Sequence, residues 1–364
     1  PQNWQNRRPP VTLGCMPKRI LLIAALSVAA LTLPATAQAA DICVGETLPN
    51  CPTQDYSATT AGLAAAIDEA NVDAGSADRI IVAAGTYSIA SGFSASLLGP
   101  TEIVGAGVDQ TVFSASADNQ IYLGFSFADP TSVVSGFTLN VTGSPNQSVG
   151  VFVDTGQASE FKVVDQSGGT ANNFRAVRLD DDASVSDFQV SMGSDGTAVV
   201  IQNGSASVSN ATLSGNGTGR GFNISTTGTA TIRRVTVRGF LDGVFSDAGT
   251  INVYDSLFDL QGTASAVAFD LFNTNDGSLT TTANFERVTV YGSGSAQKGI
   301  FFGADSGSEE FDGTFKDSVI ELDASKNPRA FDCTDGTRPV SMQLSNSAFN
   351  DDPLLNELPV ECSF

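Results

Sequence analysis

Aspartate residues close several similar short segments of this chain, and they are its strongest candidates for chemistry. Asp154 and Asp180 end two consecutive segments, and Asp247 and Asp270 end two later ones. If consecutive segments stack as neighbouring strands, each pair would stand about 5 Å apart and could hold Ca²⁺, or keep one carboxyl protonated as an acid. The alternative is that each Asp bonds its own turn and adds to a solvated acidic surface.

Basic residues near the first acidic pair are the candidate catalytic bases. Lys162 and Arg178 lie close to Asp154 and Asp180 in the sequence, so either could accept a proton from a substrate held there. The chain contains no His. Ser-His-Asp and Cys-His catalysis and His-ligated metal sites are therefore excluded.

Four further arginines, Arg233, Arg234, Arg238 and Arg287, could serve the same chemistry, but their spacing favours a structural role. A second recurring phrase aligns polar residues in one column, with alternating signs in its middle part: Asp187, Asn210, Arg234, Asp255, Arg287, Asp317 and Asn346. Opposite charges on neighbouring strands are worth from a few tenths to about 1 kcal/mol. We expect ladder ion pairs in this column, and a further pair between Arg238 and Asp259.

Three aromatic residues occupy the outward position of the first phrase. Phe152, Phe245 and Phe301 alternate with apolar residues that should face inward. Outward rings could stack on sugars and bind a polysaccharide. The alternative is that bulges or loops cover them.

The composition limits the classes of partner. The chain has 364 residues, of which 41% are hydrophobic, and a formal net charge of -21. The apolar content is enough for a large core, whereas the charge opposes attraction to nucleic acids and anionic membranes.

The N-terminal segment has the layout of a secretory signal peptide. Residues 1–15 precede the first Met and are left out of the fold prediction. Residues 16–39 contain Lys18 and Arg19, an apolar stretch and a small-residue site ending at Ala39. No later stretch is apolar for about 18 residues, so we expect a secreted or cell-surface protein without membrane insertion.

Four cysteines remain after cleavage, an even number suited to an oxidising compartment. Proximity in the sequence predicts the disulfides Cys43–Cys51, in the segment 40–57, and Cys333–Cys362, which ties in the tail 353–364. Without a CxxC spacing, a four-thiolate metal site is the weaker interpretation.

A repeat of about 22 residues dominates the rest of the chain. Successive first phrases start 26, 22, 23, 22, 23, 33 and 31 residues apart. A period of that length is typical of one turn of a wound parallel sheet, with strands stacked about 4.8 Å apart. It predicts one inward column: Val151, Val177, Val199, Phe222, Val244, Val267, Ile300 and Phe331.

An amphipathic patch at 60–71 is followed by the phrases at 80–87 and 102–107 and then by coils with Asn or Asp at the turns. This order resembles that of the right-handed parallel β-helix superfamily, which has the pectin-lyase-like fold. The resemblance covers residues 58–352. It implies an all-β solenoid with a short N-terminal capping helix, in a superfamily that includes polysaccharide lyases, glycoside hydrolases and adhesins. For a lyase, it also implies assistance by Ca²⁺.

Two activities of that superfamily lack their residues here. The segment 273–275 reads Asn-Thr-Asn where the hydrolases have Asn-Thr-Asp, and no Arg-x-Pro-x-x-Arg pattern is present. We therefore predict a non-catalytic, glycan-binding, adhesive or surface-structural protein that requires no cofactor and has a polysaccharide or cell-surface glycan as partner. The alternative is a Ca²⁺-dependent lyase acting on uronate-containing polysaccharides, with Lys162 or Arg178 beside Asp154 and Asp180.

Overall fold

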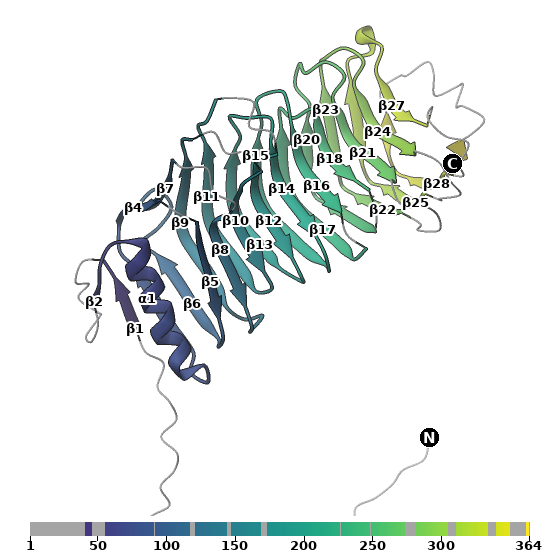
Figure 1. Cartoon of the computed structure of the whole chain (residues 1–364). Helices are drawn as coiled ribbons and strands as arrows, with labels where there is room; N and C mark the ends of the chain where they lie inside the picture. Colours follow the sequence, from purple (N-terminus) through teal and green to yellow (C-terminus); the bar gives the residue numbers. More distant parts are fainter. Residues whose placement is uncertain are drawn as a thin grey trace, which may run out of the picture. The chain divides into compact units, whose positions relative to one another are not determined.

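The computed structural model describes residues 41–45, 55–90, 92–116, 121–143, 147–168, 173–225, 227–247, 249–273, 281–304, 311–333, 340–349 and 362–363. Over these residues the chain folds as a right-handed parallel β-helix, as predicted. Every strand pairing is parallel and joins one coil to the next (Figure 1).

One sheet contains a single short strand from each coil. Its ten strands follow chain order from β5 to β27 without a crossing. They are β5 (Phe93–Leu97), β8 (Ile121–Phe127), β10 (Val149–Asp154), β12 (Arg175–Asp180), β14 (Thr197–Gln202), β16 (Arg220–Ser225), β18 (Asp242–Ser246), β21 (Val267–Asn273), β24 (Lys298–Ala304) and β27 (Arg329–Asp332). We call this the ten-stranded sheet.

The second sheet, which has twenty strands and which we call the longer sheet, completes each coil. Its twenty strands are β1 (Asp41–Val44), β2 (Asp55–Tyr56), β3 (Asp78–Val82), β4 (Gly85–Ile89), β6 (Thr101–Gly105), β7 (Thr111–Ala115), β9 (Val133–Val141), β11 (Gln157–Asp165), β13 (Ser184–Ser191), β15 (Ala206–Ser214), β17 (Thr229–Arg238), β19 (Thr250–Tyr254), β20 (Leu257–Asp259), β22 (Thr281–Glu286), β23 (Thr289–Gly292), β25 (Phe311–Lys316), β26 (Val319–Leu322), β28 (Val340–Ser345), β29 (Ala348–Phe349) and β30 (Cys362–Ser363). Three of them, β1, β2 and β30, lie outside the range 58–352. Strands β1 and β30 pair with the solenoid through β3 and β28, and β2 pairs with β1.

The predicted helix covers the first coils. Helix α1 (Thr60–Ala70) begins after Thr59, whose hydroxyl accepts a hydrogen bond from the Gly62 amide at 3.0 Å. Its buried face includes Leu63 and Ile67. Short 3₁₀ turns follow at η1 (Asn71–Asp73) and η2 (Ala324–Lys326). Helix α1 therefore covers apolar surface that no earlier coil would cover.

A column of left-handed residues bends the longer segment of each coil. The seven residues predicted to share a column all have positive φ, between 49° and 55°. Asn210 donates to Asp187 at 3.0 Å, Asn346 donates to Asp317 at 3.1 Å, and Arg287 is paired with Asp255. Arg238 also meets Asp259, at 3.0 Å. The structural interpretation of this column is confirmed.

The inward column is confirmed at every predicted position except one. Val244 pairs with Phe269 and not with Val267, so the prediction for Val267 was wrong. Phe269 lies 4.4 Å from the ring of Phe258 and 4.5 Å from that of Phe285, measured between centroids. Moving the register by two residues keeps the same face inward and buries a larger apolar side chain than Val267.

A row of small residues lies beside this column. Gly150, Ala176, Ala198, Gly221, Gly243, Ala268, Gly299 and Ala330 each precede an inward residue in the ten-stranded sheet. A Cβ at Gly243 would stand 2.6 Å from the Ala268 carbonyl oxygen and 2.9 Å from the Phe258 ring. The two sheets therefore approach closely along this row.

Several predictions about the ends fall outside the described residues. The signal peptide at 16–39, Cys51 and the side chain of Cys362 are among them, so the pairings Cys43–Cys51 and Cys333–Cys362 remain predictions. Cys43 and Cys333 are buried. Among the described helices, none has the length and apolar character needed to cross a membrane.

Candidate functional site

The outer face of the ten-stranded sheet carries one row of functional side chains. Residues in this row follow one another from strand to strand and alternate with the inward column. The row comprises Gly124, Phe152, Arg178, Val200, Asn223, Phe245, Asp270, Phe301 and Asp332. We call it the outer row.

The three aromatic residues predicted to bind substrate lie in the outer row, and each is half-buried. Each ring is covered by a basic side chain, and not by the bulge or loop that the alternative interpretation expected. Cation-to-centroid distances are 5.2 Å for Arg178 over Phe152, 3.8 Å for Arg220 over Phe245 and 3.8 Å for Lys298 over Phe301. These cation–π contacts hold the charged groups in place at the surface.

The acidic pair predicted to bind metal lies in register. Asp154 is opposite Asp180 on adjacent strands, and Asp154 accepts a hydrogen bond from Ser126 at 3.0 Å. Arg178 donates to both oxygens of Asp180, at 3.0 and 2.6 Å, and Asn203 donates to one of them at 3.2 Å. A divalent cation at this pair would have to displace the bidentate guanidinium of Arg178 from Asp180.

No group of three or more His, Cys, Asp or Glu side chains within the described ranges is arranged to hold a metal ion. The expected calcium site remains a prediction, and no chemical step below uses it.

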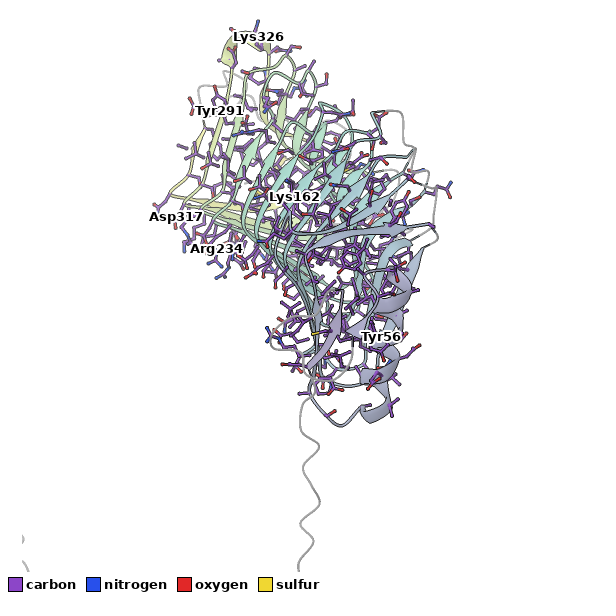
Figure 2. The ribbon with its side chains drawn as sticks, turned by 90° about the vertical axis from the view of Figure 1, so that its left-hand side faces the viewer. Tyr56, Lys162, Arg234, Tyr291, Asp317 and Lys326 are labelled. Carbon is purple, nitrogen blue, oxygen red and sulfur yellow. The ribbon has the colours of Figure 1, made fainter. Side chains whose placement is uncertain are left out.

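Lys162 and Arg178 are not brought together. Lys162 lies on β11 of the longer sheet, midway along the solenoid, and its ammonium group contacts Asp109 at 3.2 Å (Figure 2). Arg178 lies on β12 of the ten-stranded sheet and is bonded to Asp180. The two candidate bases therefore face different surfaces.

A denser constellation lies further along the outer face. Arg220 is 3.1 Å from Asp242 while its guanidinium covers Phe245. Three coils on, Lys298 and Arg329 contact the buried Asp332 at 2.9 and 2.8 Å. Asp270 lies between these ion pairs, with Phe245 and Phe301 as its row neighbours. We call Arg220, Asp242, Phe245, Asp270, Lys298 and Phe301 the Asp270 cluster.

Asp270 is the unusual member of this cluster. Its Oδ1 atom is buried and has no hydrogen-bond partner in the part of the chain that the structure describes. Burial raises the pKa of Asp270 to about 6, and the nearby Asp242 carboxylate adds to the rise, whereas Arg220 and Lys298 oppose it. Asp270 therefore exchanges its proton close to neutral pH.

Two neighbouring carboxyls are shifted in the same direction. Burial raises the pKa of Asp242 despite its ion pair with Arg220. Burial also raises the pKa of Asp247, although Ser225 donates a hydrogen bond to it at 3.4 Å. Asp242 on β18 and Asp270 on β21 are thus neighbouring carboxyls whose pKa is raised by burial, an arrangement typical of functional sites, whereas Asp247 follows β18 and has a hydroxyl donor.

The sequence analysis paired Asp270 with the wrong residue. Aligned by phrase, Asp270 was expected beside Asp247, but the two-residue shift at Phe269 places it beside Phe245. The segment before β21, residues 260–266, is longer than those before β16 (215–219) and β18 (239–241), and this difference was the signal that could have revealed the shift.

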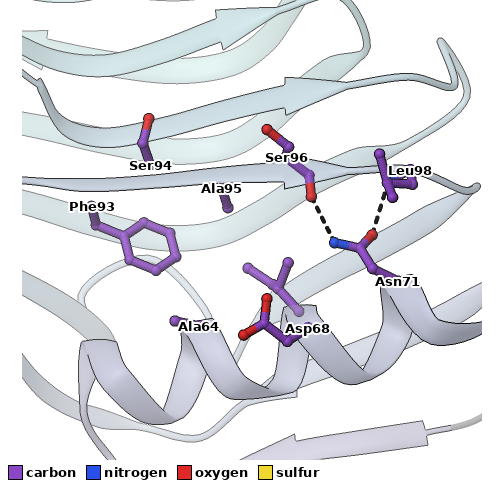
Figure 3. Close-up of a pocket in the computed structure, with 9 residues that line it drawn as sticks. Ala64, Asp68, Asn71, Phe93, Ser94, Ala95, Ser96 and Leu98 are labelled. Atoms are coloured by element: carbon purple, nitrogen blue, oxygen red, sulfur yellow. Dashed lines mark hydrogen bonds between the residues drawn. The ribbon is translucent and has the colours of Figure 1, made fainter.

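Two grooves lie away from the outer row. One, of about 250 Å³, runs between α1 and β5, the edge strand of the ten-stranded sheet (Figure 3). The Asn71 side chain donates to the Ser96 carbonyl at 2.8 Å and accepts from the Leu98 amide at 2.9 Å. It thereby satisfies backbone groups at the sheet edge that a further strand would otherwise bond. The second groove, of about 430 Å³, is lined by Arg234, Asp255 and Arg287 of the charged ladder.

Comparison with known proteins finds no family and a few similar solved structures. No family model and no curated protein matches the chain. Among solved structures, it is similar to the A-module of the mannuronan C-5 epimerase AlgE4 from Azotobacter vinelandii, with 13% identity, a TM-score of 0.42, and coverage of 84% of this chain and 95% of that one. ORF18 of Geobacillus virus E2 has 13% identity and a TM-score of 0.40, covering 80% and 58%.

A third similar structure is the catalytic domain of a GH87 alpha-1,3-glucanase in complex with tetrasaccharides. It has 14% identity and a TM-score of 0.27, and the match covers 82% of this chain and 66% of that one. TM-scores this low carry no information about what this chain does.

Proposed function

We propose that this is a secreted protein that binds polysaccharide, without catalysis, on the outer face of the ten-stranded sheet. The observation that carries the proposal is the outer row, where half-buried rings, cations and carboxylates recur on one regular surface. The part of each ring that its cation leaves exposed can contact the apolar face of a sugar, and the charged groups can bond the sugar's hydroxyls. Strands about 4.8 Å apart offer such groups repeatedly to a linear polymer.

The alternative function, a Ca²⁺-dependent lyase, has less support. Arg178 lies beside Asp154 and Asp180, but two hydrogen bonds tie it to Asp180. A base must be free to take the proton of the substrate. Lys162 lies on the other sheet, so it does not replace Arg178.

The proposal is tested by retention on immobilised or gel-embedded polysaccharides with and without chelator. Phe245→Ala removes one ring of the outer row, and Tyr254→Ala is the matched control. Tyr254 also lies beneath an arginine, with Arg233 at 5.2 Å, but on the longer sheet. We expect Phe245→Ala to weaken retention at least about tenfold and Tyr254→Ala to leave it unchanged, since losing a buried ring contact costs about 1–3 kcal/mol.

Circular dichroism of both variants shows whether each remains folded. Equal retention of the two variants would reject the outer row as the binding surface. If none of the polysaccharides retains the wild type, the proposed binding function is rejected. Appearance of unsaturated product, abolished by chelator, would favour the lyase.

A further inference from the structure

We propose that Asp270 is the hydroxyl-accepting centre of a subsite for an uncharged sugar unit. The inference rests on the proposed binding of polysaccharide to this face, and it assigns one residue and one class of ligand. It follows from the bonding of Asp270, from the surrounding charges and from the two rings beside it.

The bonding of the neighbouring acids shows what Asp270 lacks. Asp242 is paired with Arg220, and Asp332 is paired with Lys298 and Arg329. Asp247 receives the hydroxyl of Ser225. For Asp270 the structure shows no such donor among the described residues, and one of its oxygens is shut off from solvent.

Because Oδ1 has no access to solvent, a ligand can reach Asp270 only through its other oxygen, Oδ2. A hydrogen bond from a sugar hydroxyl to that charged group would contribute about 1.5–3 kcal/mol. Sugar hydroxyls are donors of the right size, and one carboxylate can accept two of them. Phe245 and Phe301, one on each side of Asp270 along the outer row, would border the same sugar ring.

The surrounding charges favour an uncharged sugar over a uronate. The nearest cations, Arg220 and Lys298, are each held by an acid and by a ring at 3.8 Å. Each is therefore already paired with one carboxylate and also acts on a second, Asp270. A uronate would place its charge beside Asp242 and Asp270, on a chain whose net charge is already -21.

Binding should depend on the ionisation of Asp270, because hydroxyl donors bond a carboxylate about twice as strongly as a neutral carboxyl. The charged groups that act on it are Arg220 on β16, Asp242 on β18 and Lys298 on β24. Asp247 follows β18, and Arg329 and Asp332 lie on β27, two strands away. With a pKa of about 6, roughly a tenth of Asp270 is ionised at pH 5 and nearly all of it at pH 7.5. Apparent affinity should then fall about tenfold between pH 7.5 and pH 5.

The test measures affinity by electrophoresis through gels that contain one polysaccharide each. Dextran, a soluble β-glucan and a galactomannan are the uncharged probes, and alginate and polygalacturonate are the anionic ones. Wild type, Asp270→Asn and Asp247→Asn are compared at pH 5 and pH 7.5. Asp247→Asn is the matched control, since the pKa of Asp247 is also raised by burial while its carboxylate has a donor.

We expect the wild type to bind at least one uncharged probe and to lose about tenfold in affinity at pH 5. Asp270→Asn should bind at least about tenfold more weakly at pH 7.5, with no remaining pH dependence, and Asp247→Asn should behave as the wild type. An Asp270→Asn variant with wild-type affinity and pH profile overturns the inference, as does binding confined to the anionic probes. In both cases the proposed binding function stands, because the wild type still binds and Phe245→Ala still weakens it.

Discussion

The raised pKa of Asp270 leads to a measurable effect on stability. A carboxyl whose pKa rises on folding binds more protons in the folded state, so folding becomes less favourable as pH increases through the interval between the two pKa values. For Asp270 that interval runs from 3.8 to about 6. The penalty is absent below the interval and fully present above it.

The size of the penalty follows from the shift. Each pKa unit corresponds to about 1.4 kcal/mol, so a shift of roughly two units sets a ceiling of about 3 kcal/mol. Because the residue is half-buried, solvent screens part of this, and we halve the figure to about 1.5 kcal/mol. Asp270→Asn keeps the shape and removes the charge, so it should stabilise the protein by about 1–2 kcal/mol at pH 7.5 and by almost nothing at pH 4.

Urea denaturation followed by circular dichroism at the two pH values measures this difference. Asp255→Asn is the control of opposite sign, because hydrogen bonding to Arg287 lowers the pKa of Asp255. That variant should lose stability at pH 7.5 and approach the wild type as the pH falls. If Asp270→Asn has an unchanged or lower midpoint at pH 7.5, the argument from burial is refuted.

Three further predictions concern the solenoid and its ends. Gly243→Val would press a side chain against Phe258 and the Ala268 carbonyl, so the variant should give little folded protein. A normal yield and an unchanged melting curve would contradict the close approach of the two sheets. Asn71→Ala removes both hydrogen bonds to the edge of β5, so it should lower the free energy of unfolding by about 1–3 kcal/mol. Hydrogen-exchange measurements should show faster exchange of the Leu98 amide. Unchanged exchange would argue against protection of this edge by Asn71. Mass spectrometry of the secreted protein should show a chain that starts at Ala40 and has no thiol reactive to iodoacetamide, and alkylation of Cys43 would contradict the predicted disulfides.

Much of the fold could be read from local patterns. Alternating apolar and polar residues at a constant period predicted parallel stacked strands, because a strand with one buried face must place every second side chain inward. The same spacing predicted the column that contains Asn210, Arg234 and Asp255, and these residues share both a left-handed backbone and hydrogen bonds or ion pairs. Helix α1 was equally visible, since its apolar residues recur at helical spacing.

The candidate site depended on contacts that no local pattern contains. Lys162 and Arg178 are 16 positions apart, yet the coil turns between them and places them on different sheets. Asp270 meets Phe245 because Phe269 packs between the rings of Phe258 and Phe285, and this moves the register of β21 by two residues. Period and polarity are properties of each segment alone, whereas register and burial arise only when one coil packs on another, and burial is what raises the pKa of Asp270.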